Sequence, residues 1–371
     1  MIKKILYIIN ILFTLLLVGS YVSALVPPDK LPYISLLTYI YPLLLIINIA
    51  FIILWLFLKW SYILIPLVAI LIKVGYINQL YASHLFFSKH EVLTTNTNIK
   101  ILSYNVCGFA YNAQNREEKR ELEDSIFNYI SSIKPEIIAF QDYFSYKDRK
   151  SIHWRIVNNL GYKYYYISEV GKKQLSGNAI YSKHPIIQSG LLFPAKKNSN
   201  SYVFADIEMD EATILRVINL HLASYKLIKQ EKEIFEEFQK GNAKEALDKN
   251  FKTIVRKLIE ANKKRSYEVK ELQPIIEHSA ERIVVLGDFN DNPFSYTYRE
   301  LSKGMIDAFT EKGEGFGTTY NGSLPVQRID YILVDKDYFK VGGFQRDKLN
   351  YSDHYPITAT LYLNRAGEVN P

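Results

Sequence analysis

Cysteine is almost absent from this sequence, since Cys107 is the only one among 371 residues. A lone cysteine cannot form an intramolecular disulfide bond, so cysteine usage does not identify the compartment. The sequence contains no CxxC or HExxH pattern, and it has no internal repeat or low-complexity tract. The zinc sites that such short spacings build, and the repeat architectures, are therefore excluded.

An excess of one charge is also missing from most of the chain. The net charge of +7 is concentrated at the N-terminus, where residues 1–82 hold five lysines and one aspartate. Residues 83–371 hold 40 basic and 37 acidic side chains. A dedicated nucleic-acid-binding domain usually carries a much larger positive charge. Charge alone therefore does not identify the partner.

Long apolar runs are what the N-terminus does contain. Ile5–Val26 and Ile34–Leu58 have no charged residue, and each is long enough to cross a hydrocarbon core, which needs about 20 apolar residues. Tyr62–Ala82 is weaker because it includes Pro66 and Lys73. This third run is either another span or an interfacial helix.

A membrane anchor explains these runs better than a cleaved signal peptide, because the first run is too long and a second follows at once. We expect residues 1–83 to form an anchor of two to three transmembrane helices, followed by a linker at 84–97. Lys3 and Lys4 favour a cytoplasmic N-terminus. Three spans would then place the rest of the chain outside the cytoplasm, whereas two would keep it inside.

From residue 98 onward, short apolar runs alternate with amphipathic stretches. The run 99–106 reads as a strand, 116–133 as a helix and 135–141 as the next strand. This mixture predicts an α/β sandwich with parallel and antiparallel pairing. Residues 226–280 are rich in charges of both signs, and we interpret them as a solvated helical hairpin inserted between two strands.

Polar side chains end many of the apolar strands. They are Asn105, Asp142, His221, Asp288, Asn290, Asp330, Asp353 and His354. A packed sheet fixes the position of the last side chain of a strand, so functional groups are often placed there. Each residue taken singly has an ordinary structural explanation, such as turn formation or capping.

The segments "GDFND" and "SDHYPI" are more informative than any single residue. Gly287 permits a sharp turn, after which Asp288 and Asn290 can project to one side of an extended chain. Oxygen ligands without cysteine suit Mg²⁺ or Mn²⁺. Histidines nearby can transfer protons and stabilise charge on a phosphoryl group. The pattern predicts metal-assisted hydrolysis of a phosphoester.

The motifs "SYNV", "FQD", "SGNAI", "NLHL", "VVLGDFND", "RIDYIL" and "SDHYPI" occur in an order that resembles the endonuclease/exonuclease/phosphatase superfamily. The resemblance covers about residues 98–365. It implies a four-layered α/β/β/α sandwich, with the charged stretch at about 226–280 as an insertion. It also implies an enzyme that cleaves phosphoester bonds with a divalent metal, Mg²⁺ or Mn²⁺. The resemblance does not include the N-terminal apolar runs, and it is those runs that predict tethering of this domain to the membrane.

The resemblance also implies roles for individual residues. Asn105 and Asp142 would stand at the metal, with Asp353 contributing. His354 would be the general base for the attacking water, oriented by Asp330. Asp288 and Asn290 would position the nucleophile and the phosphate. His221 would contact the phosphoryl oxygens or the leaving group. Asn178 would contact the phosphate or another part of the substrate. The division of labour between Asp288 and His354 is left open.

One departure from the family pattern concerns the second motif, which is Gln-Asp here in place of the usual Gln-Glu. Aspartate is one methylene shorter, whereas Mg²⁺ requires oxygen ligands at about 2.0–2.1 Å. Either the strand lies closer, or a water bridges, or the site is weakened. The alternative function is therefore a catalytically weakened module that binds phosphate on the same scaffold.

The substrate is left open between several phosphoesters. We favour a lipid headgroup or a small phosphoester over nucleic acid, because the predicted linker is short and the soluble part is nearly neutral. No protein partner is evident. We expect an integral protein of a bacterial-type inner or plasma membrane, with the catalytic domain on the non-cytoplasmic side.

Overall fold

The computed structural model describes residues 1–83, 98–192, 202–225, 243–279, 282–322 and 328–363. The chain divides into two compact units that alternate along the sequence. Unit 1 comprises Met1–Ala82, Ser224–Lys270 and Asp291–Leu301, and unit 2 comprises Ser83–Ala223, Glu271–Asn290 and Ser302–Pro371. The predicted linker at 84–97 lies outside the described residues, so it stays a prediction.

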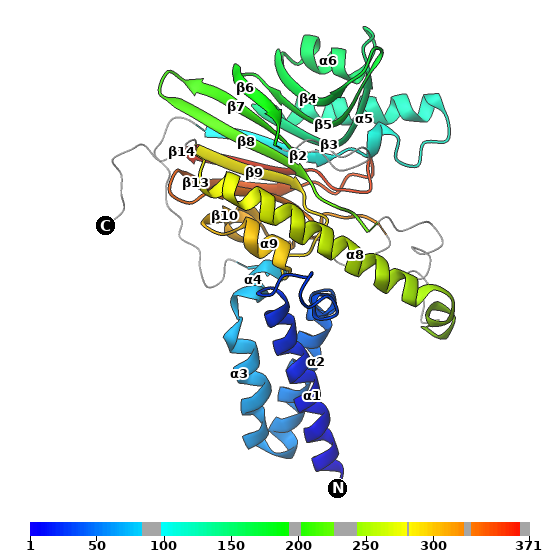
Figure 1. The fold of residues 1–371 in the computed structure, drawn as a ribbon, viewed down its shortest axis with the longest axis vertical. Helices are drawn as coiled ribbons and strands as arrows, with labels where there is room; N and C mark the ends of the chain where they lie inside the picture. Colours follow the sequence, from blue (N-terminus) through cyan, green and yellow to red (C-terminus); the bar gives the residue numbers. More distant parts are fainter. Residues whose placement is uncertain (84–97, 193–201, 226–242, 280–281, 323–327, 364–371) are drawn as a thin grey trace. The chain divides into compact units, whose positions relative to one another are not determined.

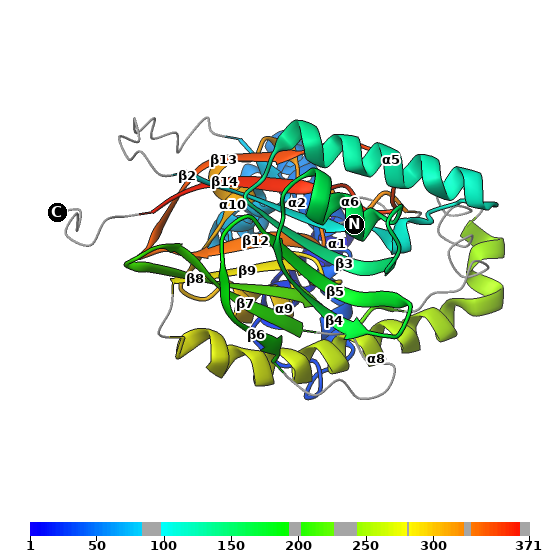
Figure 2. The same ribbon diagram turned by 90° about the horizontal axis from the view of Figure 1, so that it is seen from above.

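Unit 2 is built on two six-stranded mixed sheets (Figures 1 and 2). The first has the order β13 (Phe339–Arg346), β14 (Ile357–Leu363), β2 (Asn98–Asn105), β3 (Ile137–Tyr146), β5 (Gln174–Ser182), β4 (Tyr164–Val170). The second has the order β10 (Met305–Asp307), β12 (Asp330–Asp335), β9 (Arg282–Asp288), β8 (Thr213–His221), β7 (Tyr202–Asp210), β6 (Ile186–Leu191). The pairs β2–β3 and β8–β9 are parallel, and the other pairs are antiparallel.

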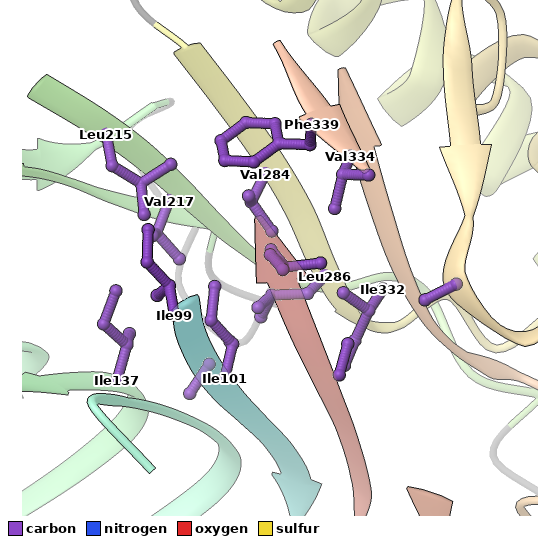
Figure 3. Close-up of a cluster of buried hydrophobic side chains, with 14 of the residues drawn as sticks. Ile99, Ile101, Ile137, Leu215, Val217, Val284, Leu286, Ile332, Val334 and Phe339 are labelled. Atoms are coloured by element: carbon purple, nitrogen blue, oxygen red, sulfur yellow. The ribbon is translucent and has the colours of Figure 1, made fainter. Parts of the chain in front are cut away.

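The two sheets pack face to face through an aliphatic core (Figure 3). Ile99, Ile101 and Ile137 come from the first sheet, and Val217 and Leu286 from the second; all five are fully buried. Alternate residues of β2 and β3 point to the opposite face, where they pack against α5 (Arg116–Ile133) and α6 (Ile152–Asn159). Both faces of the first sheet are therefore buried, which explains its nearly continuous apolar strands.

This architecture confirms the predicted α/β sandwich. The short elements η3 (Cys107–Phe109), α10 (Ala308–Lys312) and β11 (Gly315–Phe316) complete unit 2. Helix α5 begins and ends where the periodicity predicted. Asn115 caps it by accepting hydrogen bonds from the backbone amides of Glu117 and Glu118, and Lys134 ends it in the left-handed conformation.

Unit 1 contains the apolar N-terminal helices. They are α1 (Ile2–Ser23), η1 (Ile34–Thr38), α2 (Tyr41–Leu58), η2 (Trp60–Ile63), α3 (Leu64–Ile72) and α4 (Gly75–Leu80), followed by β1 (Tyr81–Ala82). Helices α1 and α2 are long and apolar enough to cross a membrane. The predicted second run starts at Ile34, but α2 itself begins at Tyr41, because the segment before it forms the separate turn η1.

The helical bundle of unit 1 buries several polar side chains among its apolar core residues, and it exposes many large apolar side chains. Asn10 and Asn48 are fully buried, and the hydroxyl of Thr14 donates to Asn48 Oδ1 at 2.8 Å. The exposed side chains of α1 include Ile5, Ile8, Leu12 and Leu15, and those of α2 include Leu43, Ile46, Ile53 and Phe57. A water-soluble bundle shows the opposite distribution.

Unit 1 also contains most of α8 (Ala243–Glu277) and the segment with α9 (Tyr296–Leu301). The described part of the charged insertion is one long helix, so the predicted hairpin is not seen in it; residues 226–242 lie outside the described residues. The prediction of a solvated insertion is wrong at Asn262, Arg265 and Ser266, which are almost completely buried. Their packing partners come from distant parts of the sequence, which a local charge pattern cannot reveal.

Candidate active site

The strand register brings most of the predicted residues together at one edge of the two sheets. In the second sheet, Asp288 on β9 pairs with His221 on β8 and with Asp330 on β12. In the first sheet, Asn105 ends β2 beside Gln141 on β3. Because parallel strands run in the same direction, the carboxyl ends of β2, β8 and β9 and the middle of β3 carry the polar cluster.

Gly287 makes the close approach of β8 and β9 possible. Its φ of 124° is a conformation that L side chains rarely adopt. A Cβ atom at this position would lie 2.1 Å from the carbonyl oxygen of Leu220. Any side chain here would therefore push β9 away from β8 and separate Asp288 from His221.

The carboxylate of Asp288 is fully buried and forms the centre of the cluster. Its Oδ2 accepts a hydrogen bond from Asn105 Nδ2 at 3.0 Å, which connects the edges of the two sheets. The same oxygen lies 3.6 Å from His354 Nε2 and 3.7 Å from His221 Nε2. Its Oδ1 accepts a hydrogen bond from the backbone amide of Asn290 at 2.8 Å.

His354 and Asp330 form the predicted imidazole–carboxylate pair. His354 Nδ1 lies 2.9 Å from Asp330 Oδ2, so Nε2 is the nitrogen directed at Asp288. The backbone of Asp330 is fixed by Thr319, whose hydroxyl accepts the amide hydrogen of Asp330 at 3.1 Å. The ring of Tyr320 packs edge-on against His354, with centroids 5.2 Å apart.

Burial and mutual charge shift the proton affinities of this cluster. Burial raises the pKa of Asp288 to about 6, and the charge of His354 opposes that rise. Burial alone would lower the pKa of His354, but the carboxylates of Asp330 and Asp288 outweigh it and raise the pKa to about 10. In the metal-free site at neutral pH, His354 is therefore an imidazolium.

Asp142, the short carboxylate of the second motif, does not end its strand as predicted: it lies at a β-bulge inside β3, which continues to Tyr146 because its pairing with β5 resumes at Tyr143. The register of β3 against β5 shifts between Phe140 and Tyr143, and Asp142 has a φ of 48°. Aspartate and asparagine tolerate the left-handed region better than glutamate does. Bulges often redirect a side chain beside an active site. The backbone at this position thus gives a physical reason for aspartate in place of the usual glutamate.

The bulge leaves the Asp142 side chain 58% exposed, with its Oδ1 3.4 Å from His221 Nδ1. The two ring nitrogens of His221 therefore face two carboxylates, Asp142 on one side and Asp288 on the other. Asp353, which is half-buried, adds its negative charge near His354.

The two predicted asparagines have different surroundings. Asn290 follows Asp288 in the left-handed conformation, with φ 51°, and donates from Nδ2 to the carbonyl oxygen of Leu222 at 3.0 Å. Asn178 is buried on β5, and its Nδ2 donates to the backbone of Asn219 at 3.3 Å. Asn178 thus connects the two sheets.

Sequence reasoning missed Asn219, Thr319 and Tyr320. Asn219 is fully buried; its Oδ1 accepts from Gln141 Nε2 at 2.7 Å, and its Nδ2 donates to the carbonyl oxygen of Phe140 at 2.9 Å. The polar residue in "NLHL", two positions before His221 on the same strand face, was a signal that could have identified Asn219. Thr319 and Tyr320 lie in a segment without any recognisable pattern.

A cluster of metal-binding type is present among the residues that the structure describes. One ligand atom from each of Asp288, Asp330 and His354 lies within 4.8 Å of the others. All three side chains are buried, and two are hard oxygen donors of the kind that divalent cations such as Mg²⁺ or Mn²⁺ bind. The donor set therefore fits a divalent cation, and this group differs from the predicted set of Asn105, Asp142 and Asp353, which stays a prediction.

The raised pKa of His354 predicts a pH dependence of stability in the metal-free protein. A histidine whose pKa rises from about 6.5 to about 10 on folding stabilises the native state below pH 6.5, and this contribution is lost as the pH rises to 10. The raised pKa of Asp288 acts at lower pH, between about 4 and 6. In EDTA, the melting-temperature advantage of the wild type over His354→Gln should therefore shrink from pH 6.5 to 10.

Differential scanning fluorimetry of the full chain in detergent measures this difference. His184→Gln provides the control, because His184 lies outside the cluster and its substitution should change the melting temperature equally at both pH values. A His354→Gln difference that stays constant across this range would contradict the assignment of a protonated His354.

Both parts of the chain match known protein families. Residues 102–354, more than half of the chain, match the endonuclease/exonuclease/phosphatase family. Residues 3–80 match a family described as a domain of unknown function, DUF8431. No match was found among curated proteins.

Solved structures similar to this chain include an endonuclease/exonuclease/phosphatase family protein from Leptotrichia buccalis, with 19% identity, a TM-score of 0.49 and coverage of 71% of this chain and 99% of that one. The corresponding protein of Bacteroides vulgatus has 16% identity, a TM-score of 0.49 and coverage of 72% and 100%. The human Nocturnin catalytic domain has 16% identity, a TM-score of 0.49 and coverage of 74% and 96%. On the extent of the family match, this chain belongs to the endonuclease/exonuclease/phosphatase family.

Proposed function

We propose that this protein is a membrane-anchored hydrolase that cleaves a phosphoester bond with a divalent metal. The observation that carries the proposal is the buried Asp288 carboxylate, which has Asn105, His221 and His354 around one oxygen. This arrangement places a carboxylate, two imidazoles and an amide at a single point on the sheet edge. Members of the family usually hydrolyse phosphoesters, and the motifs that define it here are these same residues.

The side chains of the cluster have complementary roles in this reaction. Asp330 holds the His354 ring with Nε2 facing Asp288, so the pair can orient a water molecule. Asp288 is positioned to accept the proton of that water, and His354 is positioned to stabilise negative charge on the phosphoryl oxygens. Asn290 and His221 contact the phosphate from the same strand ends.

A bound Mg²⁺ or Mn²⁺ would supply positive charge that polarises a phosphoryl oxygen. Asp288, Asp330 and His354 would hold it in the buried group, or Asn105, Asp142 and Asp353 in the set that the motifs imply. The Asp142 carboxylate favours the second set, because its side chain is 58% exposed and can be reached from solvent.

We expect hydrolysis to require both the metal and Asp288. The full chain in detergent should cleave bis(p-nitrophenyl) phosphate or p-nitrophenyl phosphate with Mg²⁺ or Mn²⁺ and lose this activity in EDTA. Asp288→Asn should lower kcat by about 10³-fold or more, because the buried acceptor of the proton is removed. Glu208→Gln, which removes one exposed carboxylate from β7, should leave kcat unchanged.

The full chain is the appropriate material, because residues 224–270 and 291–301 belong to the same compact unit as the apolar helices. Wild-type protein that binds metal and phosphate without turnover, and gains turnover in Asp142→Glu, would support the alternative of a catalytically weakened phosphate-binding module. Turnover that is independent of metal or of Asp288 would contradict the proposal.

A lipid headgroup or a small phosphoester is the substrate class that we favour, because the soluble part is nearly neutral and is tethered to apolar helices.

One feature favours nucleic acid as a second candidate. An open cleft of about 780 Å³ lies between the first turns of α5 and α6. Its lining includes Arg116, Lys119, Arg120, Arg149, Lys150 and Arg155 against three acidic residues. Helix α5 starts at the edge where β2 ends, which is the edge of the candidate active site.

Reversing charge in this cleft distinguishes the two candidates. If phospholipid vesicles or small phosphodiesters are the substrates, Arg116→Glu/Arg120→Glu should leave kcat/KM unchanged within about twofold. If a nucleic-acid strand lies in the cleft, the double variant should lower kcat/KM on an oligonucleotide at least tenfold and weaken its salt dependence. Lys163→Glu/Lys336→Glu, an equal charge change at the opposite ends of the strands, is the control.

The bundle of unit 1 supports three membrane crossings. Lys3 Nζ donates to the carbonyl oxygen of Leu58 at 3.2 Å, so the start of α1 lies beside the end of α2. The ring of Tyr62 then stacks on Tyr7, with centroids 4.1 Å apart, whereas the ring of Tyr76 lies 5.6 Å from that of Tyr21. The chain between Tyr62 and Tyr76 thus runs back along α1. We take it as a third pass, although its apolar helical stretch Trp60–Ile72 is shorter than the two helices of spanning length, α1 and α2.

The segment that joins α1 and α2 lies at the end of the bundle far from the N-terminus. Asp29 in this segment accepts from Lys270 Nζ at 2.9 Å, and Thr38 accepts from Asn292 Nδ2 at 3.2 Å. Lys270 and Asn292, which lie near the points where unit 1 continues along the chain into unit 2, therefore stand at this end of the bundle. With Lys3, Lys4 and Lys59 at the N-terminal end, the positive-inside rule favours a non-cytoplasmic catalytic domain.

Cysteine labelling tests this topology. In a Cys107→Ser background, Lys348→Cys places a thiol at an exposed position of unit 2, and Lys4→Cys places one at the start of α1. A membrane-impermeant maleimide added to intact cells or spheroplasts should label position 348 and should not label position 4 until the membrane is permeabilised. Labelling in the reverse order would contradict the proposed topology.

A further inference from the structure

The loop that carries Asn290 is held on its upstream side by the second sheet. The amide of Phe289 donates to the carbonyl oxygen of Ile329 at 2.8 Å, and the amide of Leu222 donates to that of Asp288 at 2.9 Å. Asn290 itself has a left-handed backbone. This conformation costs free energy, and it persists only where the surrounding structure enforces it. The next residue, Asp291, already belongs to unit 1.

Asp291 is fixed by a buried ion pair. Arg265 Nε donates to Asp291 Oδ2 at 3.1 Å, and the two side chains are 0% and 4% exposed. A buried guanidinium is costly unless it is paired and hydrogen-bonded. Burial lowers the pKa of Arg265, but the charge of Asp291 outweighs this effect, so the net shift is upward and Arg265 remains charged.

Arg265 also contacts the segment between the two apolar helices. Its Nη2 donates to the hydroxyl of Tyr39 at 3.1 Å, and that hydroxyl donates to Asn262 Oδ1 at 2.6 Å. Burial raises the pKa of Tyr39 far above its usual value, so it remains a neutral hydroxyl. The guanidinium lies 4.8 Å from the ring centroid of Tyr225.

A second connection runs parallel to the first. Asn292, one residue after Asp291, donates from Nδ2 to the hydroxyl of Thr38, and its Oδ1 accepts the amide of Phe294 at 3.0 Å. Two consecutive residues after the Asn290 loop are thus tied to two consecutive residues at the end of η1. The participants come from three distant stretches of the sequence, 38–39, 262–265 and 291–292.

We propose that Tyr39 and Arg265 are positioning residues for the catalytic loop. They fix Asp291, and through the adjoining peptide bond they limit the positions that Asn290 can take beside Asp288. The segment between α1 and α2 is then part of the working enzyme and not only a tether. This inference rests on the proposed function, because its catalytic consequence is expressed at Asn290.

Kinetics of the full chain in detergent, with bis(p-nitrophenyl) phosphate and Mn²⁺, test the proposal. Tyr39→Phe removes only the hydroxyl, and Arg265→Lys keeps the charge but loses the planar fork. Each should lower kcat by about 10- to 100-fold, because a small displacement of a catalytic group has effects of that size. KM should change less than twofold. The melting temperature should fall, because a buried hydrogen bond is lost, but each variant should remain folded at the assay temperature.

Asp29→Asn and Lys264→Ala are the matched controls. Asp29 lies in the same inter-helix segment and bonds Ser266 and Lys270, and Lys264 is the exposed neighbour of Arg265. Both variants should keep kcat within about twofold. A Tyr39→Phe variant as active as these controls would overturn the proposal.

Hydrogen exchange of the peptide that spans 288–295 gives a readout that is independent of turnover. Exchange should be faster in Tyr39→Phe than in the wild type and in Asp29→Asn. Wild-type protein without metal-dependent turnover would contradict the proposed function, and the exchange rates would then decide the positioning claim alone. Unchanged exchange in Tyr39→Phe would overturn it.

Discussion

The fully buried carboxylate of Asp288 is the constraint on which the site depends. A carboxylate removed from water needs hydrogen bonds or opposite charges to compensate its lost hydration. Here the compensation comes from Asn105 on the other sheet, the Asn290 amide, and the nearby imidazoles of His221 and His354. These partners can meet only if the edges of both sheets face each other and β8, β9 and β12 keep their register.

Several local features follow from that requirement. Gly287 allows β9 to approach Leu220 closely enough for Asp288 to stand beside His221. Thr319 holds the backbone of Asp330 so that its carboxylate reaches His354. The left-handed conformations at Asp142, inside β3, and at Asn290, just after β9, redirect the chain beside the site. Each is a costly local choice that the surrounding packing enforces, which is typical of functional sites.

Unit 1 is more than an apolar appendage of the chain. Its helices bury asparagine and threonine and expose aliphatic side chains, the distribution expected for helices surrounded by lipid. It also includes Arg265 and Asp291, whose ion pair stands one residue from the catalytic loop. Within this unit, the buried contacts of Arg265 join the segment between α1 and α2 to the residue that follows Asn290 in the chain.

The sequence by itself determined the α/β class, the bounds of α5, the apolar helices, the residues at the strand ends and the family. Periodicity, capping and motif order are local properties that can be read without coordinates. Only the tertiary structure revealed which oxygen of Asp288 the surrounding groups share, that Asp142 lies at a β-bulge with a left-handed backbone, and that Tyr320 packs against His354. It also revealed Arg265, which the charge pattern had assigned to solvent. Burial and pairing between residues hundreds of positions apart depend on how the sheets and helices pack, and no local pattern encodes that packing.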